Sequence, residues 1–486
     1  MKKYLGWIKV HTAVILSLII LLSATGCGYS SFDDYLKALG IMDPNEYEDD
    51  SASVITGEEV TASASLDAAS LDAEADITAS ALLSSVETED EATAQDSQYD
   101  TGAADFTYAG SYKALSDTDR EADEAMRKAR EEMGLTEEKI NSVKEQQKGL
   151  YAFERLTNAG KTLYAELLII MENHGEEILV STTSDEAVEL VFDYVMADHP
   201  EIFYVDGYQY TNYTMDDVIT KIAFTGNYIY SKEEAKERQQ RINDYVNKCL
   251  SQAPSSEDDY YVIKYVYEYL IDNTEYSIDS KDNQNICSVF IDKKSVCNGY
   301  AKATQYLLNR MGIPCTLITG TVDTKNSKNI RHAWNLVLCN NTYYYIDTTW
   351  GDSSYQTASG ESADTSKLPS INYDYLNVTT KEISKNHDIA DDLEVPLCSS
   401  MADNYYVRED EYFTSAETAL VKDLFDRRYK EGSKNVTLKC SSKDVYDQLF
   451  TQLITERKVF EYLQGENSQI SYTTFADTGT IIFWIA

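Results

Sequence analysis

The stretch SVCNGYA, residues 295–301, decides the fold, because a cysteine stands directly before an amphipathic pattern. From residue 298 to 311 apolar residues recur at helical spacing, and Gly312 and Pro314 follow as stop signals. We therefore predict that Cys297 lies at the N-terminus of a helix. The unpaired amides of a first helical turn stabilise a thiolate and can also donate to an oxyanion.

Two motifs further along the chain supply an imidazole and a carboxylate. The first is HAWN, which begins at His332, and the second is YIDTTW, which contains Asp347. They fall on two runs with strand character, residues 332–339 and 342–349, and the Asn-Asn pair at 340–341 suits a tight hairpin turn. The sequence therefore predicts a β-hairpin that carries both groups.

The turn fixes the register of this hairpin. Pairing of Cys339 with Thr342 is the expected register. Trp334 then lies opposite Asp347, and His332 lies on the same face as Asp347, as its diagonal neighbour. A carboxylate in that position can reach the imidazole.

The three groups together meet the needs of a cysteine nucleophile. An ordinary thiol, with a pKa of ~8.5, is only slightly ionised at neutral pH, so catalysis needs a cationic partner or a helix N-terminus to hold the thiolate. The imidazole in turn needs an acceptor that orients it. We therefore interpret Cys297, His332 and Asp347 as a candidate catalytic triad.

With these residues in view, the chain resembles the transglutaminase-like superfamily, whose members share a papain-like core with Cys, His and Asp in this order. The resemblance covers roughly residues 260–387 and rests on the motifs VCxGYA, GIPC, HAWN and DTTW. The runs at 198–204 and 375–387 are similar to sequence that flanks this domain in Firmicute surface proteins. The resemblance implies an α+β catalytic domain, with Cys297 as nucleophile, His332 as base and Asp347 as its orienting partner.

Three other interpretations of these residues remain open. The three side chains could be a buried thiol, a core histidine and a turn carboxylate. A structural zinc site is a second alternative, but it usually contains a C-x-x-C or H-x-x-x-H pair, which this sequence lacks. The third alternative is a non-catalytic binding module on the same fold. We expect no metal and no cofactor, and no D-x-D-x-D-G calcium loop occurs in the sequence.

Other polar residues near the motifs carry weaker predictions. Gln284 precedes the nucleophile and is a candidate second oxyanion donor, as an amide is in papain-like enzymes, although the spacing differs from papain's. His387, at the end of the resembling region, could pack near the site, and we favour a structural role for it. Six further cysteines are expected to be mostly free and buried, and a regulatory disulfide between Cys287 and Cys297 is a less favoured alternative.

The N-terminus predicts export. Three lysines precede an apolar run at 13–22, which is too short for a comfortable membrane span and ends in small residues. We predict a signal peptide over residues 1–27. Residues 24–27, Ala-Thr-Gly-Cys, resemble a bacterial lipobox, in which Cys27 receives the lipid, and an uncleaved anchor is the alternative. Either interpretation places the protein on the outer face of the cell membrane, and the Firmicute resemblance implies a Gram-positive bacterium.

An acidic segment follows the predicted signal peptide. Between residues 43 and 110 there are eighteen acidic residues and no Lys or Arg. Such a segment cannot bury enough apolar surface to fold, so residues 28–111 are predicted to be a disordered, self-repelling linker. The rest of the net charge of -40 is spread over the folded part, and no basic surface indicates nucleic acid.

The remaining sequence predicts three units: a helical and α+β lead-in at 112–250, the catalytic domain at 251–395, and a small α+β module at 396–486. In the lead-in, helices are expected at 116–134, 136–175, 184–197 and 232–250, and strands at 202–211 and 218–230. The catalytic domain opens with a helix at 258–273. In the C-terminal module, helices are expected at 415–432 and 442–456, and strands at 436–439, 471–474 and 480–485.

These observations predict an extracellular, membrane-tethered cysteine enzyme. It would attack a carboxamide or a peptide carbonyl of a protein or peptide substrate and pass through a thioester. Cell-wall peptides are among the candidate substrates. Attack of water on the thioester gives hydrolysis, as in a protease or amidase, and attack of an amine gives transglutamination. The triad is common to both outcomes, and we favour hydrolysis because the bacterial members of the family often resemble proteases.

Overall fold

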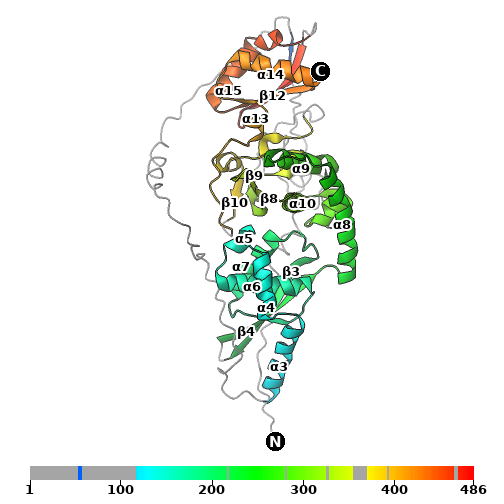
Figure 1. Ribbon diagram of the computed structural model, residues 1–486. Helices are drawn as coiled ribbons and strands as arrows, with labels where there is room; N and C mark the ends of the chain where they lie inside the picture. Colours follow the sequence, from blue (N-terminus) through cyan, green and yellow to red (C-terminus); the bar gives the residue numbers. More distant parts are fainter. Residues whose placement is uncertain are drawn as a thin grey trace, which may run out of the picture.

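The computed structural model describes residues 53–56, 117–215, 218–277, 279, 282–323, 328–353, 369–390, 393–464 and 469–485. The predicted signal peptide with Cys27 lies outside the described residues. So does the predicted linker at 28–111, except for the short strand β1 (Ser53–Thr56). Figure 1 shows the helices and strands gathered into three bodies that follow one another in chain order. Among the described residues, no helix has the length and apolar character of a membrane span.

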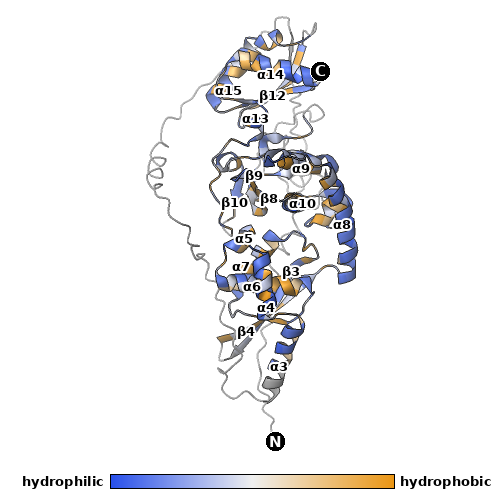
Figure 2. Cartoon of the chain, viewed as in Figure 1, coloured by the Kyte–Doolittle hydropathy of each residue, from blue (hydrophilic) through white to orange (hydrophobic). Residues whose placement is uncertain are grey.

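The first body contains five helices and three strands among its described residues. They are α3 (Asp117–Glu132), α4 (Glu137–Gln146), α5 (Tyr151–Glu154), α6 (Asn158–Glu172), β2 (Ile178–Val180), α7 (Asp185–Asp198), β3 (Val205–Met215) and β4 (Val218–Tyr228). The strands form an antiparallel sheet in the order β2-β4-β3. The next helix, α8 (Lys232–Gln252), was expected in the lead-in, but its buried residues, such as Ile242 and Val246, pack in the core of the second body. These residues recur at helical spacing, and the rest of α8 is polar, as Figure 2 shows.

The single helix predicted at 136–175 is wrong, because the segment forms α4, α5 and α6. Between α4 and α5, Gly149 has a φ of 91°, a backbone conformation that favours glycine and interrupts the helix. At the second connection, the Thr157 side chain accepts a hydrogen bond from the amide of Gly160 and so caps α6. Apolar residues keep helical spacing on both sides of these breaks, so the periodicity of the sequence does not reveal them.

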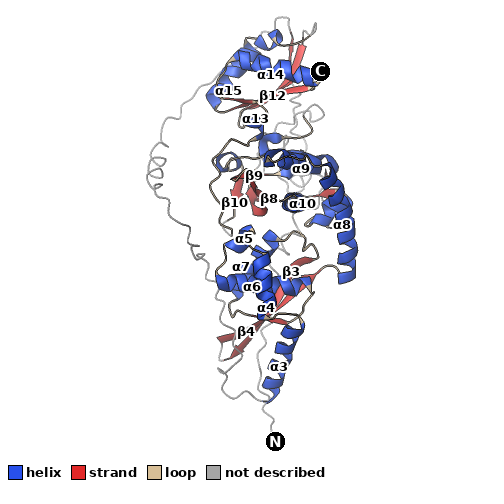
Figure 3. Cartoon of the chain, in the orientation of Figure 1, coloured by secondary structure: helices blue, strands red, loops and turns tan. Residues whose placement is uncertain are grey.

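The second body contains the predicted catalytic residues. Its elements are α9 (Asp259–Asn273), β5 (Glu275–Tyr276), the π-helical turn η1 (Ser288–Asp292), β6 (Lys294–Ser295), α10 (Cys297–Arg310), β7 (Cys315–Val322), β8 (Ile330–Cys339), β9 (Thr342–Ile346), α11 (Thr348–Ser353), η4 (Tyr373–Tyr375), α12 (Thr380–Ile383) and β10 (His387–Ile389). Four strands form an antiparallel sheet in the order β10-β7-β8-β9, and α10 packs against β7 and β8. Figure 3 shows this mixture of helix and strand.

The predicted hairpin is present, with Cys339 paired to Thr342. Asn340 and Asn341 have φ values of 48° and 63°, the positive angles that a type I′ turn requires at both central residues. The second strand is shorter than predicted, since β9 ends at Ile346 and α11 begins at Thr348. Asp347 therefore stands between strand and helix, and the expected pairing of Trp334 with Asp347 is not part of the ladder.

The third body is the C-terminal module. Before it, α13 (Tyr405–Arg408) buries Tyr405 and Tyr406 in the core of the second body. The module itself contains β11 (Tyr412–Phe413), α14 (Thr418–Glu431), β12 (Asn435–Cys440), α15 (Lys443–Phe450), η5 (Thr451–Thr455), η6 (Lys458–Glu461), β13 (Gln469–Phe475) and β14 (Thr480–Trp484). The sheet order is β1-β13-β14-β12-β11, so Ser53–Thr56 pairs with β13. Alternate residues of β12 and β14, such as Val436, Leu438, Ile481 and Phe483, are buried in one cluster with apolar residues of α14 and α15.

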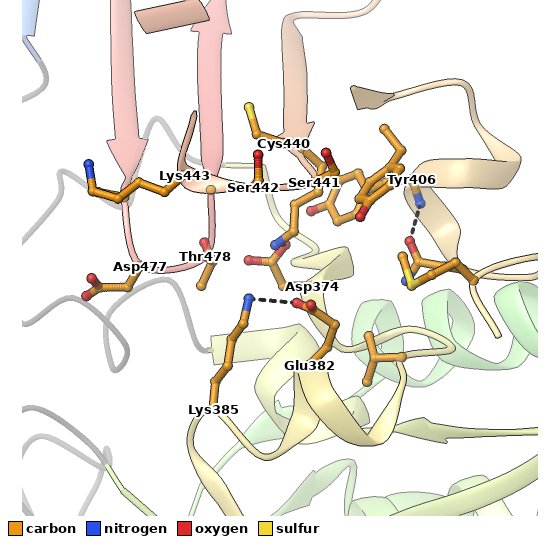
Figure 4. Close-up of a pocket in the computed structure, with 17 residues that line it drawn as sticks. Asp374, Glu382, Lys385, Tyr406, Cys440, Ser441, Ser442, Lys443, Asp477 and Thr478 are labelled. Atoms are coloured by element: carbon orange, nitrogen blue, oxygen red, sulfur yellow. Dashed lines mark hydrogen bonds and ion pairs between the residues drawn. The ribbon is translucent and has the colours of Figure 1, made fainter. Parts of the chain in front are cut away.

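A cavity of about 310 Å³ lies between the second and third bodies (Figure 4). Two of its three lysines pair with acids of the same lining: Lys439 Nζ lies 2.7 Å from Asp374 Oδ1, and Lys385 Nζ lies 2.7 Å from Glu382 Oε2. The third, Lys443, pairs with Asp447 outside the cavity. None of the predicted triad residues lines this cavity. We therefore interpret it as part of the contact between the two bodies, separate from the site around Cys297.

Candidate functional site

Cys297 is the first residue of α10, as the sequence predicts. Val296 stands at the N-cap, and its apolar side chain cannot accept hydrogen bonds from the first-turn amides, which is unusual for this position. Among the seven cysteines that the structure describes, all are free, and Cys297 is the one that is partly exposed while the other six are buried. The prediction of mostly free, buried thiols is therefore confirmed for the described part of the chain, and the alternative disulfide between Cys287 and Cys297 is not formed.

The first turn of α10 packs tightly against the segment before it. A Cβ atom at Gly299 would overlap the hydroxyl oxygens of Ser295 and Ser288. These two buried hydroxyls are hydrogen-bonded to each other, with their oxygens 2.6 Å apart. The position therefore has room for glycine alone, and this packing fixes the turn that carries the thiol.

Replacing Gly299 by alanine is expected to lower the free energy of unfolding by about 2 kcal/mol, because the added methyl group displaces two buried, bonded hydroxyls. Alkylation of Cys297 should slow at the same time. Chemical denaturation and alkylation of the same samples measure both effects. The matched control is the double variant Gly299→Ala/Ser295→Ala, which should recover about half of the lost stability. A Gly299→Ala protein as stable as the wild type would contradict this packing argument.

His332 and Asp347 meet as the sequence predicts. His332 Nε2 lies 2.7 Å from Asp347 Oδ2, and both side chains are buried. The other carboxylate oxygen, Oδ1, accepts a hydrogen bond of 3.0 Å from the backbone amide of Trp350 and so caps α11. Because Nε2 faces the carboxylate, Nδ1 is the ring nitrogen left for the thiol of Cys297, which contributes to the raised pKa of the imidazole.

The electrostatics of the pair favour charge on both partners. Burial alone would lower the pKa of His332, but the charge and hydrogen bond of Asp347, together with Cys297, raise this pKa to about 10. Burial would raise the pKa of Asp347, but His332 and His387 hold it well below its usual range. At neutral pH the site therefore contains a buried imidazolium beside a carboxylate, and an imidazolium is the cation that favours a neighbouring thiolate.

Gln284 lies beside the residue that follows the nucleophile. Its Oε1 accepts a hydrogen bond of 2.5 Å from Asn298 Nδ2, and its Nε2 donates one of 3.0 Å to Asn283 Oδ1. One amide hydrogen is thus committed to a neighbour, and the second is the one that an oxyanion could use. The role of Gln284 as an oxyanion donor stays a prediction.

Residues 250–348 match the family model of the transglutaminase-like superfamily. The chain contains a transglutaminase-like domain. The matched segment includes Cys297, His332 and Asp347, and the predicted α+β fold with this core is confirmed. No curated protein matches the chain significantly.

Solved structures resemble the chain over about a third of its length. They include a TGase (14% identity, 33% of this chain and 50% of that one, TM-score 0.23). They also include a candidate cysteine protease from Cytophaga hutchinsonii (12% identity, 30% and 62%, TM-score 0.21) and a candidate protease from Parabacteroides distasonis (9% identity, 30% and 36%, TM-score 0.18). Each match spans less than two thirds of the other protein, and scores this low add nothing to the functional argument.

His387 lies at the site itself, a place that the sequence analysis allowed for it while favouring a structural role. It lies on β10, outside the matched segment of the transglutaminase-like domain, and its Nε2 is 3.0 Å from Asp347 Oδ2. The same carboxylate oxygen thus faces two imidazoles. Burial lowers the pKa of His387, in spite of the neighbouring carboxylate, so this ring is neutral where His332 is charged.

The three side chains His332, Asp347 and His387 also form a group whose potential metal ligands lie within 4.8 Å of one another. Both imidazoles, however, turn the same nitrogen, Nε2, toward one carboxylate oxygen at hydrogen-bonding distance. A metal would need the lone pairs of the atoms that here carry protons. The geometry therefore fits a proton-sharing network better than a metal site.

Proposed function

We propose that this chain is a cysteine acyl-transfer enzyme that uses Cys297 as nucleophile. The observation that supports the proposal most is the buried His332–Asp347 pair beside a partly exposed thiol at a helix N-terminus. A solitary structural thiol has no need of an oriented, charged imidazole, whose burial costs free energy unless it is paired. The arrangement is the one that nucleophilic catalysis by cysteine requires.

In the proposed reaction, the Cys297 thiolate attacks the carbonyl carbon of a peptide bond or side-chain carboxamide. The carbonyl electrons move to oxygen, and the oxyanion is stabilised by amides of the first turn of α10. His332 then gives its proton to the departing nitrogen, so an amine or ammonia leaves and a thioester remains on Cys297. Asp347 keeps Nε2 protonated and Nδ1 directed at the reacting groups throughout.

The thioester is then resolved with His332 acting as base. His332 removes a proton from water, the hydroxide oxygen bonds to the acyl carbon, and the C–S bond breaks to give a carboxylic acid and the thiolate. An incoming amine in place of water would give a new amide bond. We propose that water is the main acceptor, on the grounds of the resemblance to protease-like bacterial members, and that proteins or peptides, cell-wall peptides among them, are the substrates.

The test is incubation of the purified full chain with peptide libraries and cell-wall fragments, followed by mass spectrometry. The expected result is cleavage or deamidation of particular peptides, together with a transient acyl adduct on Cys297. Cys297→Ala is the matched control and should show neither. Products that form equally with Cys297→Ala would refute the proposal, and cross-linked products without hydrolysis would refute the preference for water. A complete absence of products would favour the non-catalytic binding module.

We also propose that the enzyme is exported and tethered to the outer face of the membrane by a lipid on Cys27. The proposal is supported by the lipobox-like residues 24–27 after a short apolar run. Incorporation of a labelled fatty acid in the native host should be complete for the wild type and absent for Cys27→Ala. Cys249→Ala is the control and should label as the wild type does. Labelling of the Cys27→Ala protein, or none in the wild type, would show that the lipid anchor is wrong.

A further inference from the structure

We propose that His387 is a positioning residue, which fixes the Asp347 carboxylate by donating its Nε2–H to Oδ2 and so sets the orientation and proton affinity of His332. This inference rests on the proposed function of the site. Its main support is the geometry of the two imidazoles around one oxygen, with Nε2–Oδ2 distances of 2.7 Å for His332 and 3.0 Å for His387.

The sheet brings the two histidines together across one intervening strand. On β7, Gly320 pairs with His332 of β8 on one side and with Ile389 of β10 on the other. His387 lies two residues from Ile389, so its side chain points to the same face as that of His332. A Cβ atom at Gly320 would overlap the backbone oxygen of Asp388 and the ring of Trp334, so glycine lets β10 and Trp334 pack closely here. The centroids of the two imidazole rings are 5.5 Å apart.

The surroundings of His387 keep its ring neutral. Three aromatic rings enclose it, with centroids at 4.8 Å for Trp350, 4.9 Å for Trp334 and 5.7 Å for Tyr375. Its side chain is fully buried, and the ionisable groups that act on it are Asp347 and His332. Since His332 already supplies a positive charge to this carboxylate, a second buried cation on the same oxygen would be repelled by the first.

A hydrogen-bonded chain links His387 to Tyr375, and a neutral ring requires its amide to be turned. In the structure, His387 Nδ1 lies 2.6 Å from Asn386 Oδ1, and Asn386 Nδ2 donates a hydrogen bond of 2.8 Å to the hydroxyl of Tyr375. A half-turn of this amide exchanges its nitrogen and oxygen without changing its shape. With nitrogen toward His387, Asn386 donates to Nδ1 and accepts from Tyr375. In that arrangement Tyr375 donates to Asn386, Asn386 donates to His387, and His387 donates to the carboxylate of Asp347.

The consequence concerns His332. Asp347 Oδ1 is held by the amide of Trp350, and Oδ2 is held by both imidazoles, so the carboxylate cannot rotate and its charge is shared between two side-chain donors. Without the donor at His387, the full charge of Oδ2 acts on His332. The imidazolium of His332 would then retain its proton to a higher pH.

The experiment compares His387→Gln with His387→Met in the full chain, with iodoacetamide as the probe and site-resolved mass spectrometry of Cys297 from pH 5 to 11. Glutamine can donate an amide N–H to Asp347, and methionine has similar length but no donor. In the wild type, alkylation should rise a second time where His332 loses its proton. We expect this second rise to move upward by about one pH unit in His387→Met and to stay near the wild-type position in His387→Gln.

An unchanged profile in His387→Met would overturn the positioning role and leave the proposed function intact. Equal shifts in both variants would also overturn it, since the donated hydrogen bond would then be irrelevant. A wild-type Cys297 without any reactivity at pH 6 would overturn the proposed function and this inference with it. If thermal melting shows that His387→Met does not fold, Tyr375→Phe takes its place: a smaller upward shift supports the chain of donors, and no shift contradicts it.

Discussion

Asp347→Ala is expected to lower the free energy of unfolding by about 3 to 5 kcal/mol, the cost of breaking a buried ion pair by removal of one partner. The substitution leaves the imidazoles of His332 and His387 and the amide of Trp350 without their common acceptor. Urea denaturation at pH 7, followed by circular dichroism, measures the loss. Asp347→Asn is the matched control, because its side-chain oxygen can still cap α11, so it should lose less stability.

The pH dependence of this loss has a definite sign. The pKa of His332 is raised in the folded protein, so the stability that the pair contributes is fully present below the unfolded-state value of ~6.5 and is lost as the pH rises through about 10. The difference in the free energy of unfolding between the wild type and Asp347→Ala should therefore become smaller between pH 7 and pH 10. A variant within about 0.5 kcal/mol of the wild type at pH 7 would show that the pair is not a structural centre of the domain.

His332→Ala should cause a large loss of function. It removes the cation that favours the thiolate and the base that resolves the thioester, so turnover of any substrate found for the enzyme should fall by about four orders of magnitude. At pH 6, alkylation of Cys297 should slow about 100-fold, toward the rate of an ordinary thiol.

The control for His332→Ala is His174→Asn. His174 lies in the first body, where its ring stacks on Tyr204 and Tyr228, and its φ of 52° is one that asparagine tolerates. This variant should leave both turnover and the alkylation of Cys297 unchanged. A His332→Ala protein that keeps the wild-type alkylation rate at pH 6 would contradict the proposed role of the imidazole.

The sequence was sufficient to predict the residues whose signals are local. Cys297 is marked by the helix that follows it, and His332 is marked by a strand that ends in an Asn-Asn turn with one favoured geometry. The cap that Asp347 provides for α11 was missed, although an Asp followed by Thr-Thr-Trp is a reasonable helix start. A strand is the favoured prediction for that stretch because its residues are β-branched and aromatic.

The part of the site that could not be predicted depends on long-range pairing. β10 has only three residues, too few for a period-2 pattern, and it reaches the site because it pairs with β7, more than sixty residues earlier in the chain. Nothing near His387 in the sequence indicates that it shares a carboxylate with His332. The register of the sheet brings Gly320 and the aromatic rings next to His387, and the sequence alone does not predict this register.

The most direct test of the central claim is the rate of Cys297 alkylation by iodoacetamide at pH 6, relative to a small reference thiol such as N-acetylcysteine. The buried thiols serve as internal controls, because burial raises the pKa of Cys249 and Cys398 to about 11 and that of Cys287 and Cys440 to about 12. If Cys297 is held as a thiolate beside the imidazolium, it should react about 100-fold faster than the reference thiol, and the buried cysteines should remain unmodified. A Cys297 that reacts no faster than the reference thiol would contradict the claim that this site contains an activated nucleophile.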